Sequence, residues 1–274
     1  VCSSDLVSIE FSDLHLSFSP LPGLEFSQVL AEVGAFSPLM SEELGIYPSL
    51  SAVISQAPYG KIKVGGLFKG NLNLNVKKGA RTEAGESKMA VTIQGEDLSL
   101  EDIRQWARLP MNLKGTLGID SSISADPTMK EQPDAEMNFQ VNKFELPPFP
   151  LVTDMGAITL PELKFSNVEL KGRLSEGKFI IESGKLGKEN DELFGTIKGN
   201  LGVNIVGSQG GISPQIGAYT IDLDLKMKKS FENRLSLFLT LISQFKSEAG
   251  PLSQYKFRVS AFSLRENPKF TRAQ

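Results

Sequence analysis

The chain has 274 residues, a net charge of −3 at pH 7 and 40% hydrophobic residues, which excludes an intrinsically disordered protein and allows one large domain or two small ones. Its Lys and Arg residues are scattered, so the basic surface that nucleic-acid binding requires is not predicted. No run of about 18 apolar residues occurs, and the sequence as given predicts no membrane-spanning helix.

The first residues contain the only cysteine, Cys2. A single cysteine excludes an internal disulfide and the usual kind of zinc site. Residues 1–6 resemble a translated sequencing-adapter tail, and we expect them to be non-native. Any signal or anchor segment of the natural protein would then lie outside this sequence. We expect residues 7–270 to form a single elongated β-rich domain.

The N-terminal quarter alternates apolar and polar side chains, which predicts strands. Two alternating runs at 7–11 and 14–18 have opposite parity, so Ser12-Asp13 between them indicates a bulge. Residues 24–33 fit a strand or a short helix, and 41–44 favour a helical turn. Residues 61–76 fit either a hairpin around Gly65-Gly66 or one long bulged strand.

Two segments have helical periodicity. In the first segment, residues 98–109, Ser99 precedes Asp102 by three positions, a spacing that resembles a capping box. Pro110 ends this predicted helix. Its apolar stripe includes Leu100, Ile103 and Trp106, and we interpret Trp106 as a packing anchor rather than a ligand platform. The apolar face of the second segment, residues 233–246, consists of Leu235, Phe238, Leu239, Ile242 and Phe245. A helix this apolar is expected to cover another surface.

One strand type recurs four times: an apolar residue, Lys, Gly, a variable residue and Leu, starting at Phe68, Leu113, Leu170 and Ile197. The irregular spacing excludes a solenoid of fixed period. Glycine in such a strand admits a bulge, and lysine keeps an edge soluble. Four copies predict one extended antiparallel sheet.

The rest of the chain continues this pattern. Period-two alternation predicts strands at 135–141, 158–165, 168–174, 178–186, 193–206, 219–227 and 255–264. The prolines between 147 and 150 interrupt regular ladder pairing and indicate a bend or an edge crossing. Glycines near 176–177, 187 and 207–211 indicate hairpin turns.

The sequence contains few of the side chains that commonly act in catalysis. His15 is the only histidine, and its place between Leu14 and Leu16 puts it on the polar face of a strand, where a solvated side chain is expected. Triads that use Ser/His or Cys/His are therefore not predicted. We expect the protein not to be an enzyme and to hold neither a cofactor nor a metal ion.

The Leu-Pro-x-x-Leu-Lys-Gly-Thr-Leu run at 109–117 and the helix before it resemble the general secretion pathway protein N family of type II secretion systems. The Gly-Lys strands at 177–186, the Leu-Phe-Gly-Thr-Ile-Lys-Gly strand at 193–199, the opening segment at 16–24 and Asn267-Pro268 also fit this family. It is related to AsmA-like and TamB-like envelope proteins. The resemblance implies a mainly β fold with a few helices: a long antiparallel sheet, curled into a taco or half-barrel and capped by two amphipathic helices.

The resemblance also implies a location and a surface. The domain would lie in the periplasm of a Gram-negative bacterium, held at the inner membrane by an anchor helix that this sequence lacks. The inner face of the curled sheet would be an apolar groove lined by Leu72, Leu74, Val76, Leu113, Leu117, Ile119, Leu201, Val203, Ile205, Leu223 and Leu225. The two helices, through the residues named above, would cover part of it.

Two functions follow from the resemblance. The first is a non-enzymatic component of the type II secretion system, acting through contacts with its other components. The second is a lipid-binding or lipid-transfer module whose groove holds the acyl chains of phospholipid or lipopolysaccharide. A dozen apolar side chains left in water would forfeit on the order of 20–30 kcal/mol of burial, so helices, a partner or lipid must cover the groove.

Overall fold

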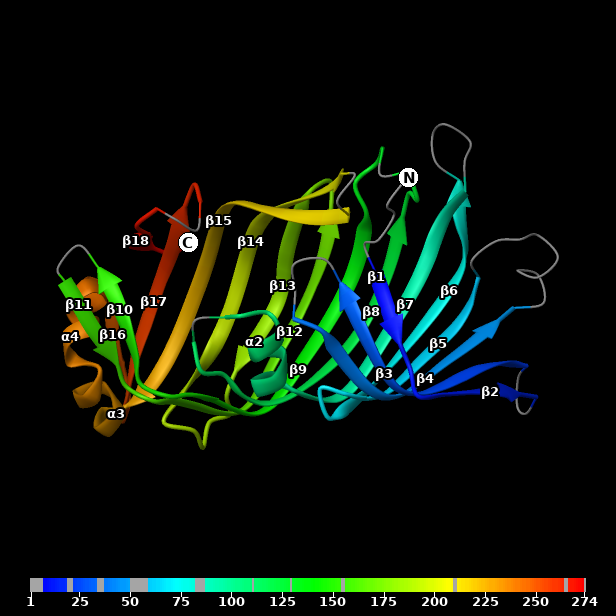
Figure 1. Ribbon diagram of the computed structural model, residues 1–274. Helices are drawn as coiled ribbons and strands as arrows, with labels where there is room; N and C mark the ends of the chain where they lie inside the picture. The colour runs from blue at the N-terminus through cyan, green and yellow to red at the C-terminus, as the bar shows by residue number, and fades with distance from the viewer. Residues whose placement is uncertain are drawn as a thin grey trace. The chain divides into compact units, whose positions relative to one another are not determined.

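The computed structural model describes residues 7–18, 22–33, 37–49, 59–81, 87–109, 111–128, 130–153, 156–208, 211–263 and 266–273. Strands dominate this part of the chain, and neighbouring strands form one large antiparallel sheet (Figure 1). The hydrogen-bonded order is β1-β3-β4-β5-β6-β7-β8-β9-β12-β13-β14-β15-β17-β16, with β2 paired to β3 and β18 paired to β17. The prediction of a mainly β fold built on a large antiparallel sheet is confirmed.

The strands of the N-terminal half are β1 (Val7–Glu10), β2 (Asp13–Ser17), β3 (Gly23–Val33), β4 (Leu39–Pro48), β5 (Gly60–Leu67), β6 (Gly70–Arg81), β7 (Ser87–Ser99), β8 (Lys114–Ala125) and β9 (Asp134–Leu146). The later strands are β10 (Phe149–Thr153), β11 (Gly156–Leu160), β12 (Leu163–Ser175), β13 (Lys178–Leu186), β14 (Leu193–Ser208), β15 (Gly211–Lys228), β16 (Lys246–Ala249), β17 (Leu252–Ala261) and β18 (Lys269–Arg272).

The chain divides into two compact units. Unit 1 consists of residues 1–110, 117–136 and 205–213, and unit 2 consists of residues 111–116, 137–204 and 214–274. The expectation of a single domain over residues 7–270 stays a prediction.

Strands β1 and β2 lie end to end along one side of β3. Glu10 pairs with Leu30 and Asp13 pairs with Ser27, three residues further along both strands, so β1 and β2 keep one register against β3 and the bulge predicted at Ser12-Asp13 is wrong. The backbone N–H of Ser12 donates to the carbonyl of Ser27 at 3.0 Å, and Gln28 opposite this break has a φ of 47°. The break at Ser12 thus separates two strands on one edge.

Two sequence interpretations near β4 and β5 are corrected. Residues 41–44 form no helical turn but lie inside β4, which pairs with both β3 and β5. Residues 60–81 form a hairpin, but its turn lies at Phe68-Lys69, where both φ values are positive, and not at Gly65-Gly66. Gly65-Gly66 instead lies where the register between β5 and β6 shifts. Strand pairing overrides the local turn preference of these residues.

The first predicted helix is shorter than expected. Helix α2 spans Leu100–Trp106, and the side chain of Ser99 accepts a hydrogen bond from the backbone N–H of Asp102 at 3.3 Å, as a helix N-cap does. Arg108, with a φ of 53°, takes the left-handed conformation two residues after the helix. The helix therefore ends before Pro110 is reached.

The second predicted helix, residues 233–246, is divided and begins earlier. It consists of α3 (Lys229–Arg234), α4 (Ser236–Ile242) and a 3-10 turn, η1 (Ser243–Phe245), and β16 begins at residue 246. Leu235 separates the two α-helices, with φ −94° and ψ 6°. Leu235 at this break is buried, with 5% of its surface exposed.

The prolines near 147–150 coincide with a separate two-stranded sheet. Strand β10 pairs only with β11 among the described strands, and Pro150 lies opposite Thr159 in this hairpin. Proline is tolerated here because each strand of a two-stranded sheet has a free edge. The hairpin contacts α4. Strands β10 and β11 therefore lie outside the main sheet, at the place where the prolines were predicted to interrupt ladder pairing.

The four recurring Lys-Gly pairs share a packing reason for glycine. A Cβ atom at Gly115 would lie 2.9 Å from the carbonyl oxygen of Asn142, and one at Gly172 would lie 2.7 Å from that of Ile180. A Cβ at Gly70 would overlap the carbonyl oxygen of Glu96, and a Cβ at Gly199 would overlap that of Thr220. Each glycine therefore permits a neighbouring backbone to approach closely, and at Gly172 the register also shifts.

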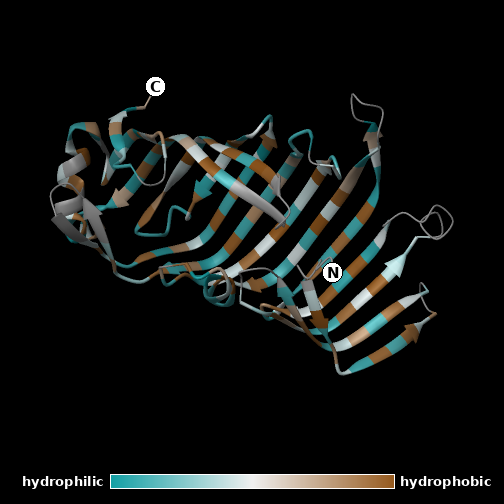
Figure 2. Cartoon of the chain, turned by 45° about the horizontal axis from the view of Figure 1, so that its top comes forward, coloured by the Kyte–Doolittle hydropathy of each residue, from teal (hydrophilic) through white to brown (hydrophobic). Residues whose placement is uncertain are grey.

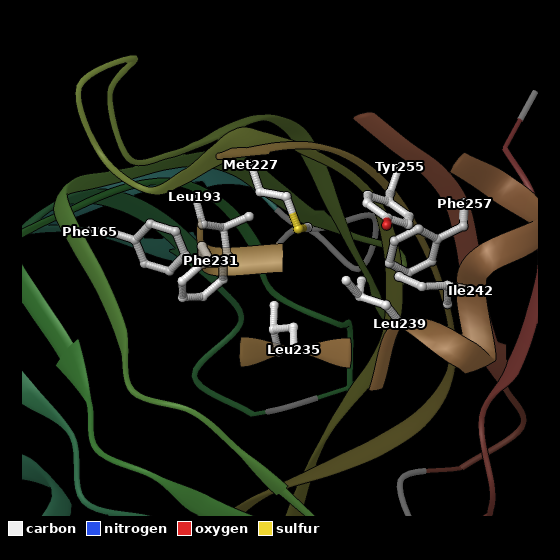
Figure 3. Packing of buried hydrophobic residues seen from close by; sticks show 9 residues of the cluster. All are labelled: Phe165, Leu193, Met227, Phe231, Leu235, Leu239, Ile242, Tyr255 and Phe257. Atoms are coloured by element: carbon white, nitrogen blue, oxygen red, sulfur yellow. The ribbon is translucent and has the colours of Figure 1, made fainter. Parts of the chain in front are cut away.

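The main core lies in unit 2. It gathers side chains from four strands and from α3 and α4, and its nine buried members, shown in Figure 3, are Phe165, Leu193, Met227, Phe231, Leu235, Leu239, Ile242, Tyr255 and Phe257. Ile242 is completely buried, and Met227 is 1% exposed. The apolar faces of α3 and α4 therefore pack against the apolar side chains of β14, β15 and β17.

Candidate functional site: an apolar sheet face

Two rows of apolar side chains cross strands β2 to β7 in unit 1. Residues directly opposite each other in an antiparallel sheet point to the same face. The first row is Leu16, Leu24, Ile46, Ile62, Leu74 and Ile93, each paired with the next. The second row is Leu14, Phe26, Leu44, Val64, Leu72 and Gly95, joined in the same way. These two rows are called the N-terminal apolar face.

The N-terminal apolar face is only partly covered. Its members on β4, β5 and β6 are half-buried, and exposure increases toward β2, where Leu16 is 68% exposed. Figure 2 shows the origin of this face as alternating hydrophobic and hydrophilic bands along the strands. Full burial of such a side chain is worth about 1.5–3 kcal/mol relative to full exposure, so covering the part of the face that is still exposed is favourable.

The opposite face of the same strands is polar and hollowed. The residues that line a hollow of about 540 Å³ include Gly45, Gly65, Tyr47 and Lys63. The Tyr47 hydroxyl donates to Glu25 at 2.7 Å, which lowers the pKa of Glu25 and raises that of Tyr47. The sheet thus separates a polar face from an apolar one within unit 1.

The residues predicted to line a groove lie in both units, and all of them are half-buried. Leu72 and Leu74 belong to the N-terminal apolar face, and Val76 continues it opposite Val91. Ile119 on β8 lies beside Gly95, with its Cβ 3.6 Å from the position a Gly95 Cβ would take. In unit 1, the other predicted residues are Leu117 on β8 and Ile205 on β14.

Unit 2 contains the remaining predicted groove residues. Leu223 and Leu225 pair with Phe257 and Tyr255 and pack against the main core. Leu201 lies opposite Phe179 on β13. The other two residues are Val203 on β14 and Leu113, which precedes β8.

The predicted covering residues of the second helix lie at the main core. Leu235, Leu239 and Ile242 are buried there, beside the strand residues Leu223 and Leu225. Phe245 stacks on Phe257 with 6.3 Å between ring centroids. The side chain of the remaining predicted residue, Phe238, lies outside the described residues.

The predicted residues of the first helix pack locally in unit 1. Leu100 is buried, Ile103 and Trp106 are half-buried, and the Trp106 ring lies 5.8 Å from that of Phe68. Asp102 pairs with Lys69 at 3.0 Å. A second hollow of about 510 Å³ adjoins Trp106 and Phe68. Sequence reasoning did not identify Phe68 as a partner, because it lies 38 positions from Trp106.

Sequence reasoning also missed the parts of the N-terminal apolar face on β2, β3, β4, β5 and β7. The signal was present, because Ile62 and Val64 alternate with Lys61 and Lys63. Alternation alone does not show which residues on neighbouring strands lie opposite Ile62 and Val64. Pairing of β5 with β4 and β6 determines this register.

Within the described residues, no group of three or more His, Cys, Asp and Glu side chains is arranged to hold a metal ion. No helix there has both the length and the apolar character needed to cross a membrane. No family model, curated protein or solved structure matches this chain.

Proposed function

We propose that the protein is a non-enzymatic component of the bacterial type II secretion system, acting in the periplasm through contacts with other components of that system. The resemblance of the Lys-Gly strands and of residues 109–117 to the protein N family supports this role. The structural observation that carries it is the N-terminal apolar face, which is continuous over six strands and only partly covered. An anchor at the inner membrane belongs to the same proposal.

A protein-contact role follows from the energetics of this face. Its side chains already form a regular surface, so a partner needs little rearrangement to cover it. The polar hollow lies on the other side of the same strands and leaves the two faces chemically distinct. A partner that presents apolar side chains would therefore bind one face of unit 1 only.

Genetic deletion tests the secretion role. Loss of the gene is expected to abolish export of type II secretion substrates into the medium, while other envelope functions continue. Complementation with Ile62→Asn, which places an amide on the apolar face, should fail to restore export. Lys63→Asn introduces the same residue on the opposite face and is the matched control, which should restore it. Normal export after deletion would contradict the proposal.

A second candidate function is a lipid-binding or lipid-transfer module. It is favoured by one specific observation: neither row of the N-terminal apolar face contains a charged side chain. Acyl chains of phospholipid or lipopolysaccharide would lie along these rows, and a curl of the sheet would enclose them. This candidate includes the groove and its covering helices.

Native mass spectrometry with lipid extraction tests the lipid candidate. Protein purified from a host that contains membranes should carry lipid, and Ile62→Asn should reduce the bound fraction while Lys63→Asn leaves it unchanged. Thermal melting of both variants checks that they are folded. Absence of lipid from the parent protein would count against this candidate without affecting the secretion proposal.

A further inference from the structure

The two edges of the main sheet differ in their protection against further strand pairing. Each edge consists of two short strands placed end to end, β1 and β2 on β3 and β16 and β18 on β17. Lysine and arginine on an edge strand discourage pairing with another chain. Strands β16 and β18 carry Lys246, Lys269 and Arg272, whereas β1 and β2 carry no basic residue apart from His15. The β2 edge is the less protected one.

The N-terminal apolar face ends at β2, which pairs with β3 on one side only among the described strands. Among the described strands, Leu24 has Leu16 on one side and Ile46 on the other, whereas the cross-strand partner of Leu16 is Leu24 alone. Leu14 is 50% exposed and Leu16 is 68% exposed. Phe18, directly after the strand, is 80% exposed. Five exposed large apolar side chains therefore lie on or beside β1 and β2: Ile9, Phe11, Leu14, Leu16 and Phe18.

The sequence of β2 is complementary to itself in one antiparallel register. When two copies pair about His15, Leu14 of each copy lies opposite Leu16 of the other, on the apolar face. On the polar face, Asp13 lies opposite Ser17, and His15 lies opposite His15. No two carboxylates or ammonium groups face each other, and like charges directly opposite would be unfavourable.

We propose that two copies of this protein associate through β2, in antiparallel register centred on His15. The two-fold axis of such a pair is perpendicular to the sheet, so the N-terminal apolar faces of both copies lie on the same side. Leu14 and Leu16 gain the cross-strand neighbours that they lack in a single copy, and the backbone groups of β2 that face away from β3 gain hydrogen bonds. The interface is isologous and closed, so it stops at two copies.

Neighbouring charges on the polar face are compatible with this pairing. Glu25 on β3 lies opposite His15 in the same copy, and Asp13 and Ser17 flank it along β2. Each His15 would therefore lie between Glu25 of its own copy and His15 of the other. This inference goes beyond the proposed function and does not depend on it.

Solution mass measurement is the first test. Sedimentation velocity from about 1 to about 100 μM should show a monomer–dimer equilibrium with a dissociation constant in the micromolar range, as expected for a small interface. Leu16→Lys should weaken it by about tenfold or more. Thr271→Lys, which adds the same charge on β18 at the other edge, should leave it unchanged. A parent protein that is monomeric throughout this range would overturn the proposal.

Cysteine crosslinking tests the register in a Cys2→Ser background. His15→Cys should form an intermolecular disulfide with oxidised glutathione, because directly opposite Cα atoms lie about 4.5–5.5 Å apart. Asp13→Cys and Ser17→Cys should not crosslink alone, since like positions would be four residues, or roughly 13 Å, out of register. An equimolar mixture of the two should crosslink. Crosslinking of Ser17→Cys alone, with no crosslink between the two different variants in the mixture, would overturn this register.

Charge reversal provides an independent check that a misfolded variant cannot imitate. His15→Lys and His15→Glu each place like charges opposite each other, so each should be monomeric. Their equimolar mixture should form heterodimers, because Lys then faces Glu. If the parent dimerises but this mixture stays monomeric, pairing centred on His15 is wrong.

Discussion

Glu232 on α3 anchors the helices of unit 2 to the strands beside them. Its carboxylate accepts hydrogen bonds from Ser253 at 2.6 Å and Tyr255 at 2.7 Å, and the Lys246 ammonium lies 2.6 Å from it. Burial raises the pKa of Glu232, but the contacts with Lys246, Ser253 and Tyr255 outweigh it and lower the pKa to about 2. The ionised carboxylate is therefore part of the folded structure.

Glu232→Gln is expected to reduce the free energy of unfolding by about 2 kcal/mol at pH 7, since it removes a charge-assisted hydrogen-bond acceptor. The folded-state pKa lies below the ordinary value of 4.5. The stabilisation is thus complete above about pH 4.5 and is lost as pH falls toward 2. Urea unfolding at several pH values measures this.

The control for this prediction is Glu189→Gln, which changes an exposed carboxylate in a turn of unit 2. It should shift the free energy of unfolding by less than about 0.5 kcal/mol. A gap between parent and Glu232→Gln that stays constant from pH 7 to pH 2.5 would contradict the assigned pKa.

At the scale of single elements, close approach between strands determines which residues tolerate a side chain. Gly199 on β14 has a φ of 151°, and a Cβ there would overlap the carbonyl oxygen of Thr220 and lie 2.8 Å from the Cα of Ile221. Gly217 on β15 is different, because the nearest atom to its Cβ position is 3.8 Å away. These two glycines form a matched pair.

Gly199→Ala is expected to lower the free energy of unfolding by about 1–3 kcal/mol, since β14 and β15 must move apart to admit the methyl group. Gly217→Ala should be neutral or stabilising by up to about 1 kcal/mol, because it only reduces the freedom of the unfolded chain. Chemical denaturation of both variants measures the difference. Equal effects at the two positions would show that close strand packing is not the cause.

At the scale of the whole molecule, charge and the N-terminal apolar face act in opposite directions. The net charge of −3 at pH 7 favours repulsion between copies, whereas an uncovered apolar surface favours association. The isoelectric point of the sequence is about 5.5, where the repulsion disappears.

Light scattering of this 274-residue chain at low salt should therefore be greatest near pH 5.5 and lower at pH 7.5. Added salt should flatten the dependence, because it screens the net charge. Scattering that does not change between these pH values would indicate that charge does not limit association.

Much of the sheet was predictable because alternation is a local signal. Runs such as 178–186 and 219–227 show period two within themselves, and each lies in a strand, β13 and β15. Residues 41–44 show the limit of this reasoning. Their composition favours a helical turn, but β3 and β5 pair with them on both sides, and that pairing depends on residues outside the segment.

The candidate site was predictable only in part. Leu72 and Leu74 were identified on β6, whereas their partners Val64 and Ile62 on β5 were not, because the position of the turn sets the register. The predicted location in the periplasm and the predicted function stay predictions, since neither follows from strand pairing.

The sequence by itself determined the strand-rich character, the positions of the helical segments and the scarcity of catalytic side chains, because periodicity and composition need no partner. Tertiary structure decided which leucines share a face, why Gly199 must lack a side chain, and that Glu232 meets Ser253 and Tyr255. Each of these depends on strands or helices that approach each other from separate parts of the chain, and their register is fixed only when they pack.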